Sequence, residues 1–249
     1  MFVMDILAIA AVAFTAAGFV KGVVGFGFPV ITLIILTLTI GLLDALAIVV
    51  IPTIVTNIWQ SFSGPYLKEI VRRMWLYFVT AIIFIWFTSG YLTVVNVKWP
   101  TAILGAVLFV FALTRLLNVS ITVPPKWERP LSIPLGAING MLTGMTGSFM
   151  VPSVLFMQAI GFQREMLVQA MGVFFALSTF MLAVSLGNND LISMEHVRLS
   201  LFALVPSIIG LYIGRWTRRR INEDRFQQVF LGAVLLLGGY ITYHSVVAS

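Results

Sequence analysis

Six apolar runs dominate this chain, and each is about long enough to cross a lipid bilayer as a helix. A transmembrane helix needs about 20 consecutive apolar residues. The runs lie at 42–62, 74–91, 99–117, 166–186, 197–216 and 226–247. They are apolar at nearly every position, whereas the strands of an outer-membrane barrel alternate apolar and polar residues. The sequence therefore predicts an all-α polytopic membrane protein.

The composition supports a lipid-facing surface. Hydrophobic residues make up 60% of the chain and charged residues 10%, whereas a soluble domain has about 25% charged residues. The net charge of +6 comes from basic residues at the ends of the apolar runs, which is typical of membrane topology signals and not of nucleic-acid binding. We therefore expect the lipid bilayer as a partner and no nucleic acid.

Two further apolar regions, 5–40 and 131–160, are interrupted by glycine and proline. A continuous helix over the first would be about 54 Å long, well beyond the 30 Å hydrocarbon core. Gly25, Gly27 and Pro29 interrupt this region. The second contains Gly147 and Pro152, and such residues kink or break helices. Each region could be one kinked crossing or a re-entrant hairpin.

The basic residues favour hairpins. If every region crossed once, seven basic residues would lie on each side. With two hairpins, only Lys98 and Arg198 lie on one side, and the other side collects twelve: Lys68, Arg72, Arg73, Arg115, Lys126, Arg129, Arg164, Arg215, Arg218, Arg219, Arg220 and Arg225. This bias is typical of a cytoplasmic face, so both termini are predicted outside the cytoplasm. Two full crossings per region would leave the basic residues on the same sides. However, arms of about 13 residues at 131–160 are too short to span the membrane.

Each half of the chain then holds one hairpin and three crossings. The first repeat is predicted at 1–120 and the second at 121–249, and both contain the string Leu-Gly-Ala-Val-Leu, at 104–108 and 231–235. A hairpin returns to the side on which it entered, so a repeat with one hairpin and three crossings starts and ends on opposite sides of the membrane. The two repeats are therefore expected to be inverted. Paired interrupted segments indicate the binding site of a secondary transporter. We expect the two hairpin tips to meet near the midplane; the alternative is two packed kinks without a cavity.

The tips predict an anion site. A second helical arm begins at each tip, and its unpaired N–H groups attract anions. Lys21 is the basic residue deepest in an apolar region, so we expect it to meet an anionic substrate; alternatively it snorkels to an interface or is a neutral amine. The candidate substrate-binding residues are Lys21, Gly25, Phe26, Gly27, Phe28, Asn57, Asn139, Thr143, Thr146, Gly147, Ser148 and Gln169.

Other interpretations of these residues stay open. The hydroxyls could bond to their own helix, and the amides of Asn57 and Gln169 could join helices as readily as they could contact substrate. The spaced glycines of 18–22, 136–144 and 210–214 predict close helix packing. No metal site, cofactor or catalytic residue is expected. An intramembrane enzyme, the least favoured alternative, would need a paired nucleophile and base or a metal cluster; a Ser148–Lys21 dyad is conceivable, but nothing in the spacing favours it.

The interrupted segments resemble the TauE/SafE family of membrane transporters, the sulfite exporters. The resemblance rests on Gly136, Gly140 and Gly147 followed by Val151-Pro152, and on the spaced glycines of 18–27 in the first half. It departs from the family in lacking a triple glycine in either half. The resemblance implies export of a small sulfur-containing anion, such as sulfite or an organosulfonate like sulfoacetate.

We therefore expect a bacterial inner-membrane carrier that exports such an anion by alternating access, and not an enzyme. A carrier for another small anion is the alternative. A cation carrier is disfavoured because Asp5, Asp44 and Asp190 lie at segment ends. A uniporter and a proton-linked carrier both stay open, and the sequence assigns no oligomeric state.

Overall fold

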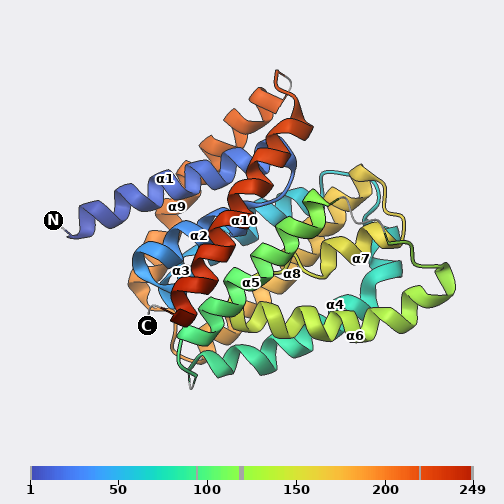
Figure 1. Cartoon of the computed structure of the whole chain (residues 1–249), viewed down its shortest axis with the longest axis horizontal. Helices are drawn as coiled ribbons and strands as arrows, with labels where there is room; N and C mark the ends of the chain where they lie inside the picture. The colour runs from blue at the N-terminus through green and yellow to red at the C-terminus, as the bar shows by residue number, and fades with distance from the viewer. Residues whose placement is uncertain (1, 94, 118–120, 219, 248–249) are drawn as a thin grey trace.

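A computed structural model describes residues 2–93, 95–117, 121–218 and 220–247, and the regular structure in these residues is entirely helical. The elements, drawn in Figure 1, are α1 (Phe2–Val24), α2 (Phe28–Ile40), α3 (Leu42–Ser61), α4 (Leu67–Ser89), the 3-10 helix η1 (Gly90–Thr93), α5 (Lys98–Leu116), α6 (Pro125–Thr146), α7 (Ser153–Ala159), α8 (Arg164–Asn188), α9 (Met194–Arg218) and α10 (Glu223–Val247).

Six helical segments are long and apolar enough to cross a membrane. They are Leu42–Ser61, Leu67–Leu92, Lys98–Leu116, Arg164–Asn188, Met194–Arg218 and Asp224–Val247. Each coincides with one of the six predicted apolar runs. The prediction of a multi-pass helical membrane protein is confirmed.

Both predicted helix breaks are present. The first separates α1 from α2 at Gly25 and Gly27, whose φ angles are 91° and 96°. The second ends α6 at Gly147, whose φ is 70°. Glycine suits all three positions because it adopts a positive φ without steric cost. We call these segments the first break and the second break.

The first helix of the second region is longer than predicted. α6 has 22 residues and begins at Pro125, six residues before the expected start at 131. Pro130 and Pro134 lie inside the helix, and Arg73 Nη2 of α4 anchors its start through Glu128 Oε1 at 2.7 Å. An arm of this length rises about 33 Å, so the expectation of an arm too short to span was wrong for α6.

The long helices pack in pairs along much of their length. α1 lies beside α9 and α6 beside α4, and α3 packs on α8 and α5 on α10 (Figure 1). Glycines allow the close approach: a Cβ at Gly22 would lie 2.8 Å from Arg215 N, and one at Gly140 would lie 3.0 Å from Ala81 Cα. The predicted packing role of the spaced glycines is confirmed at these positions.

One end of the molecule is strongly basic. There Arg73 Nη2 also donates to the Ile160 carbonyl at 2.8 Å, and Arg115 Nη1 of α5 donates to Gln158 Oε1 at 2.8 Å. The start of α8 and the end of α9 line a common pocket at this end, with Arg164 and Arg218. Lys98 begins α5, and Arg198 lies near the start of α9, at the opposite end. We call the end with these arginines the basic end.

Candidate functional site

Lys21 is a buried basic residue on the last turn of α1. Its side chain is 5% exposed, and its Nζ donates to Thr56 Oγ1 at 3.1 Å and also to Asn57 Oδ1, both on α3. The Phe28 ring centroid lies 5.9 Å from Nζ. Within the described part of the chain, no carboxylate forms an ion pair with Lys21. The ammonium is therefore held by neutral groups alone, although a buried cation is most stable beside an anion.

The neighbouring face of α3 has unused hydrogen-bonding groups. Thr53 and Asn57 are one helical turn apart and therefore share this face. Asn57 Nδ2 and Thr53 Oγ1 are buried, and neither has a hydrogen-bond partner among the described residues. Such groups are normally satisfied by protein or water. They leave hydrogen-bonding capacity beside Lys21 for water or a small polar ligand.

α8 adds a further hydroxyl at the same level. α8 contacts α3 where Gly172 lies beside Gln60 and Ser61. Because α8 leaves the basic end and α3 runs toward it, Thr53 falls level with Ser178 in register. Ser178 Oγ is likewise buried and has no partner in the described chain.

A pocket leads from the basic end to Lys21. Its lining residues are Lys21, Gly22, Gly25, Thr56, Trp59, Gln60, Ser63, Val168, Leu211, Arg215 and Arg218. At its mouth the Arg215 guanidinium lies 3.7 Å from the centroid of the Trp59 ring. Lys21 is buried while Arg215 and Arg218 are exposed, so the positive charge extends from the surface to the interior. Such a charge distribution attracts anions.

The first break lies against the same pocket. Gln60 Nε2 donates to the Gly25 carbonyl at 3.2 Å and to the Val168 carbonyl at 2.7 Å. Gly27 precedes α2 without a side-chain cap, and the ring of Phe28, the first residue of α2, lies 5.9 Å from Lys21 Nζ. Phe26 instead packs on α5, with its ring centroid 6.3 Å from that of Phe111.

The second break has its own polar cluster. Asn139 Nδ2 donates to the Phe149 carbonyl at 3.0 Å, and Thr143 Oγ1 reaches both Asn139 Oδ1 at 3.1 Å and the Ser148 carbonyl at 3.2 Å. Thr146 Oγ1 donates to the carbonyl of Leu142 on its own helix at 2.6 Å. These bonds support the unwound backbone between α6 and α7.

The two breaks lie at opposite ends of α3. Gly147 faces the Leu46 side chain, whereas Gly25 is bonded to Gln60. Leu46 and Gln60 are fourteen residues apart, or about 21 Å of helix rise. The expected meeting of the two tips near the midplane therefore does not occur. The reason is that α1 and α6 are full-length helices, so each break follows a complete traverse of the bundle.

The pattern of the whole chain agrees with one known family. A family model described as Sulfite exporter TauE/SafE matches residues 9–241. The chain belongs to the TauE/SafE family. Members of this family are transporters and not enzymes, and membership implies a transporter of sulfite or an organosulfonate. No curated protein and no solved structure matches the chain.

Gln169 of this TauE/SafE protein has a structural role. Its Nε2 donates to the carbonyls of Ser61 at 2.8 Å and Gly64 at 2.7 Å, and its Oε1 accepts from Tyr66 N at 2.9 Å. The amide therefore fixes the turn between α3 and α4 from its position on α8. Of the two alternatives for Gln169, hydrogen bonding between elements is the one that these contacts favour.

Several polar residues in or near the Lys21 pocket were not predicted from the sequence of this TauE/SafE protein. Thr53, Thr56 and Ser178 are hydroxyls in apolar runs, where a bond to the helix's own backbone is the ordinary expectation. Thr56 Oγ1 does donate to the Pro52 carbonyl at 2.8 Å while it accepts from Lys21. Arg215 and Arg218 resembled topology anchors. The one available signal was the polar pair Thr53 and Asn57, spaced by one turn.

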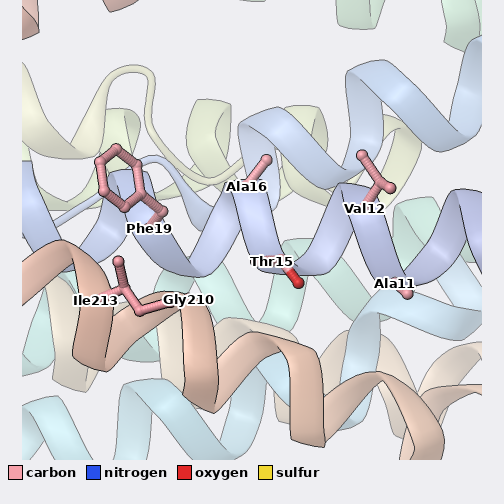
Figure 2. A pocket seen from close by; sticks show the side chains of 7 residues that line it. All are labelled: Ala11, Val12, Thr15, Ala16, Phe19, Gly210 and Ile213. Atoms are coloured by element: carbon pink, nitrogen blue, oxygen red, sulfur yellow. The ribbon is translucent and has the colours of Figure 1, made fainter.

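An outward-facing groove between α1 and α9 is unsuited to an anion. Figure 2 shows its lining side chains, which are apolar except for the Thr15 hydroxyl: Ala11, Val12, Thr15, Ala16, Phe19, Gly210 and Ile213. None of these residues has a charged or amide side chain. Unlike the Lys21 pocket, this groove therefore offers an anion no positive charge.

Proposed function

We propose that this protein exports a small sulfur-containing anion, sulfite or an organosulfonate such as sulfoacetate, from the cytoplasm across a bacterial inner membrane. The observation that supports this most directly is Lys21, a buried basic side chain that has no carboxylate partner among the described residues and lines a pocket together with Arg215 and Arg218. In this proposal the substrate supplies the missing negative charge.

The oxyanion binds between α1, α2 and α3. Lys21 Nζ supplies charge, and Asn57 Nδ2 supplies an N–H that has no partner in the described chain. The uncapped start of α2, from Gly27 onward, adds backbone N–H groups whose dipoles favour an anion. Charge-assisted hydrogen bonds of this kind are shorter and stronger than neutral ones. The anion thereby replaces the contact between Lys21 and Asn57 Oδ1.

The second break serves the later part of the path. Ser148 Oγ is buried and lacks a partner among the described residues, and Asn139 and Thr143 lie beside it through their bonds to the unwound backbone. This cluster is neutral, so it holds the anion less tightly than Lys21 does. A second binding site with weaker affinity for the anion favours its release on the far side of the membrane.

Inverted repeats at 1–120 and 121–249 supply the conformational change. If each helix of one repeat is replaced by its counterpart in the other repeat, the pair α1–α9 becomes the pair α6–α4. The pairs α3–α8 and α5–α10 are unchanged by this exchange. This correspondence supports two returning helical arms, α1–α2 and α6–α7, in opposite orientations. Rocking of one repeat against the other would expose the path to each side in turn.

The basic end faces the cytoplasm in this proposal, and both termini lie on the other side, as the positive-inside rule requires. An inside-negative potential then favours anion exit by about 2.3 kcal/mol per charge per 100 mV. Net export therefore needs no coupling ion, although a proton-linked mechanism is compatible with the same site.

Flux in proteoliposomes tests the proposal. Labelled sulfite and sulfoacetate are supplied to the native protein, to Lys21→Ala, and to the matched control Lys126→Ala, whose side chain is exposed at the start of α6. We expect saturable flux of at least one anion, its loss in Lys21→Ala and its retention in Lys126→Ala. Native flux that survives Lys21→Ala removes Lys21 from the site. Absence of native flux for both anions contradicts the proposed substrate class.

A further inference from the structure

A buried tyrosine hydroxyl on α4 is not used by the packing that surrounds it. Tyr77 lies near the middle of α4 and is fully buried. Its ring stacks on Phe156 of α7, with 5.5 Å between the ring centroids, and meets Phe174 of α8 edge-on at 5.3 Å. The hydroxyl has no hydrogen-bond partner among the described residues, although a buried tyrosine O–H normally finds one. Packing therefore holds the ring, and the O–H remains available as a donor.

This hydroxyl belongs to the polar cluster of the second break. It lies within reach of the Asn139 side chain of α6, and Asn139 Nδ2 donates to the Phe149 carbonyl at 3.0 Å. Ser148, which precedes Phe149 in the chain, has a second buried hydroxyl without a partner in the described residues. Tyr77 of α4 and Ser148 of the second break are thus linked through Asn139 and its backbone acceptor.

α8 supplies a third unpaired hydroxyl. Ser178 is buried, and its Oγ has no partner in the described part of the chain. It lies one turn beyond Phe174, whose ring contacts that of Tyr77. It also lies two turns before Ser185, whose hydroxyl contacts that of Ser89 on α4. Residues at these spacings share one face of a helix, so Ser178 is on the side of α8 that faces α4.

These three hydroxyls differ from others in the same helices. A hydroxyl in a membrane helix ordinarily donates to a carbonyl of its own helix. Thr179 does so with the Phe175 carbonyl at 2.7 Å, and Ser207 of α9 does so with the Ala203 carbonyl at 2.6 Å. A buried donor without an acceptor costs free energy. Three such donors beside one break therefore indicate an occupant whose atoms accept their hydrogen bonds.

We propose that the hydroxyls of Tyr77, Ser148 and Ser178 donate to the oxygen atoms of the substrate anion as it passes the second break. The inference rests on the proposed function, because the anion is the one that leaves Lys21. Three neutral donors match the three oxygens of sulfite or of a sulfonate group, and they add no charge that would retain the anion. Tyr77 thereby helps to determine which anions pass.

Tyr77→Phe tests this role, because it removes the hydroxyl and keeps the ring that Phe156 and Phe174 hold. We expect the KM for flux of labelled sulfite or sulfoacetate in proteoliposomes to rise about tenfold, since a hydrogen bond to a charged group is lost. The melting temperature should be equal or higher, because an unused buried O–H does not stabilise the fold. The matched control is Tyr212→Phe on α9, whose side chain is exposed and whose KM should be native.

Two results with Tyr77→Phe overturn the proposal. An unchanged KM means that the hydroxyl does not contact the substrate. A melting temperature that falls together with the flux means that the hydroxyl has a structural role.

Cysteine reactivity tests the cluster without any transported anion. The chain contains no cysteine, so Ser178→Cys places a single thiol in the cluster. Ser207→Cys places one at an equally buried position on α9. The probe is sulfonatoethyl methanethiosulfonate, a thiol reagent that carries a sulfonate group. We expect it to modify Ser178→Cys at least tenfold faster than Ser207→Cys in proteoliposomes, because the anion path reaches only the first. Equal rates overturn the site.

The two experiments separate this inference from the proposed function. If the native protein moves neither sulfite nor sulfoacetate, the proposed function fails, but selective modification of Ser178→Cys still supports an anion-accessible cluster. If the native protein transports and both Tyr77→Phe and Ser178→Cys behave as their controls do, the proposed function stands and this inference is overturned.

Discussion

Lys21 Nζ donates a hydrogen bond to Thr56 Oγ1 at 3.1 Å, which joins the last turn of α1 to α3 close to the first break. Thr56 Oγ1 in turn donates to the Pro52 carbonyl at 2.8 Å. The threonine therefore presents a lone pair to the ammonium while its own proton is used within α3. This arrangement orients the Lys21 side chain through a neutral acceptor, as an anion site at Lys21 would require.

A carboxylate beside Lys21 should abolish anion binding without unfolding the protein. In Asn57→Asp, the new carboxylate occupies the position of Asn57 Oδ1, which already accepts a hydrogen bond from Lys21 Nζ. An opposite charge at about 4 Å contributes about 4 kcal/mol at an effective dielectric constant of 20, so the ion pair should outcompete the substrate. We expect flux to fall at least tenfold while the melting temperature is equal or higher.

The control for this variant is Asn57→Ser, which removes the amide and adds no charge. It should retain part of the flux, because Lys21 keeps its charge. If Asn57→Asp and the native protein transport equally, the substrate does not use the Lys21 ammonium.

The contact between Arg215 and Trp59 at the mouth of the pocket should affect the KM for anion flux. The guanidinium lies 3.7 Å from the ring centroid, and such a cation–π contact contributes about 0.5–1 kcal/mol at exposed sites. Trp59→Ala should loosen Arg215 and raise the KM for anion flux about two- to fivefold, whereas Trp59→Phe should preserve most of the affinity. A KM that is identical in all three proteins would show that Arg215 needs no support from Trp59.

Glycine at position 22 should be needed for the contact between α1 and α9. A Cβ there would lie 2.8 Å from Arg215 N and 2.9 Å from Gly214 Cα, and backbone atoms cannot move aside without separating the helices. Overpacking of this kind costs about 1–3 kcal/mol, so Gly22→Ala should lower the melting temperature in detergent. Gly232→Ala is the matched control, since a Cβ at Gly232 meets nothing within 4 Å. Equal melting temperatures for the two variants would contradict the close packing.

The sequence predicted the spans and the breaks because both depend on local signals. Apolar runs of helical length identified the six spans, and Gly25, Gly27 and Gly147 marked the breaks, where the structure has positive φ angles. Lys21 and Asn57 were both predicted as site residues, and they meet across two helices. Their contact itself was not predictable, because it depends on how α1 packs on α3.

Other features depended on tertiary structure. The second interrupted region was expected to begin at 131 with a short first arm, but α6 begins at Pro125 and packs along α4. Its length moved the second break to the far end of α3, away from the first. The sequence also could not show that the hydroxyls of Thr53 and Ser178 are buried without a hydrogen-bond partner in the described chain, since this depends on the tertiary packing around each of them.

Cysteine labelling should reveal the orientation of the two ends. The chain contains no cysteine, so single replacements report on one position each. Lys126→Cys lies at the basic end and Lys98→Cys at the opposite end, and neither lysine is buried. In intact spheroplasts, a membrane-impermeant maleimide should label Lys98→Cys alone, and both should react after the membrane is permeabilised. Labelling of Lys126→Cys in intact spheroplasts would place the basic end outside, and the Arg218 pocket could then no longer receive anions from the cytoplasm.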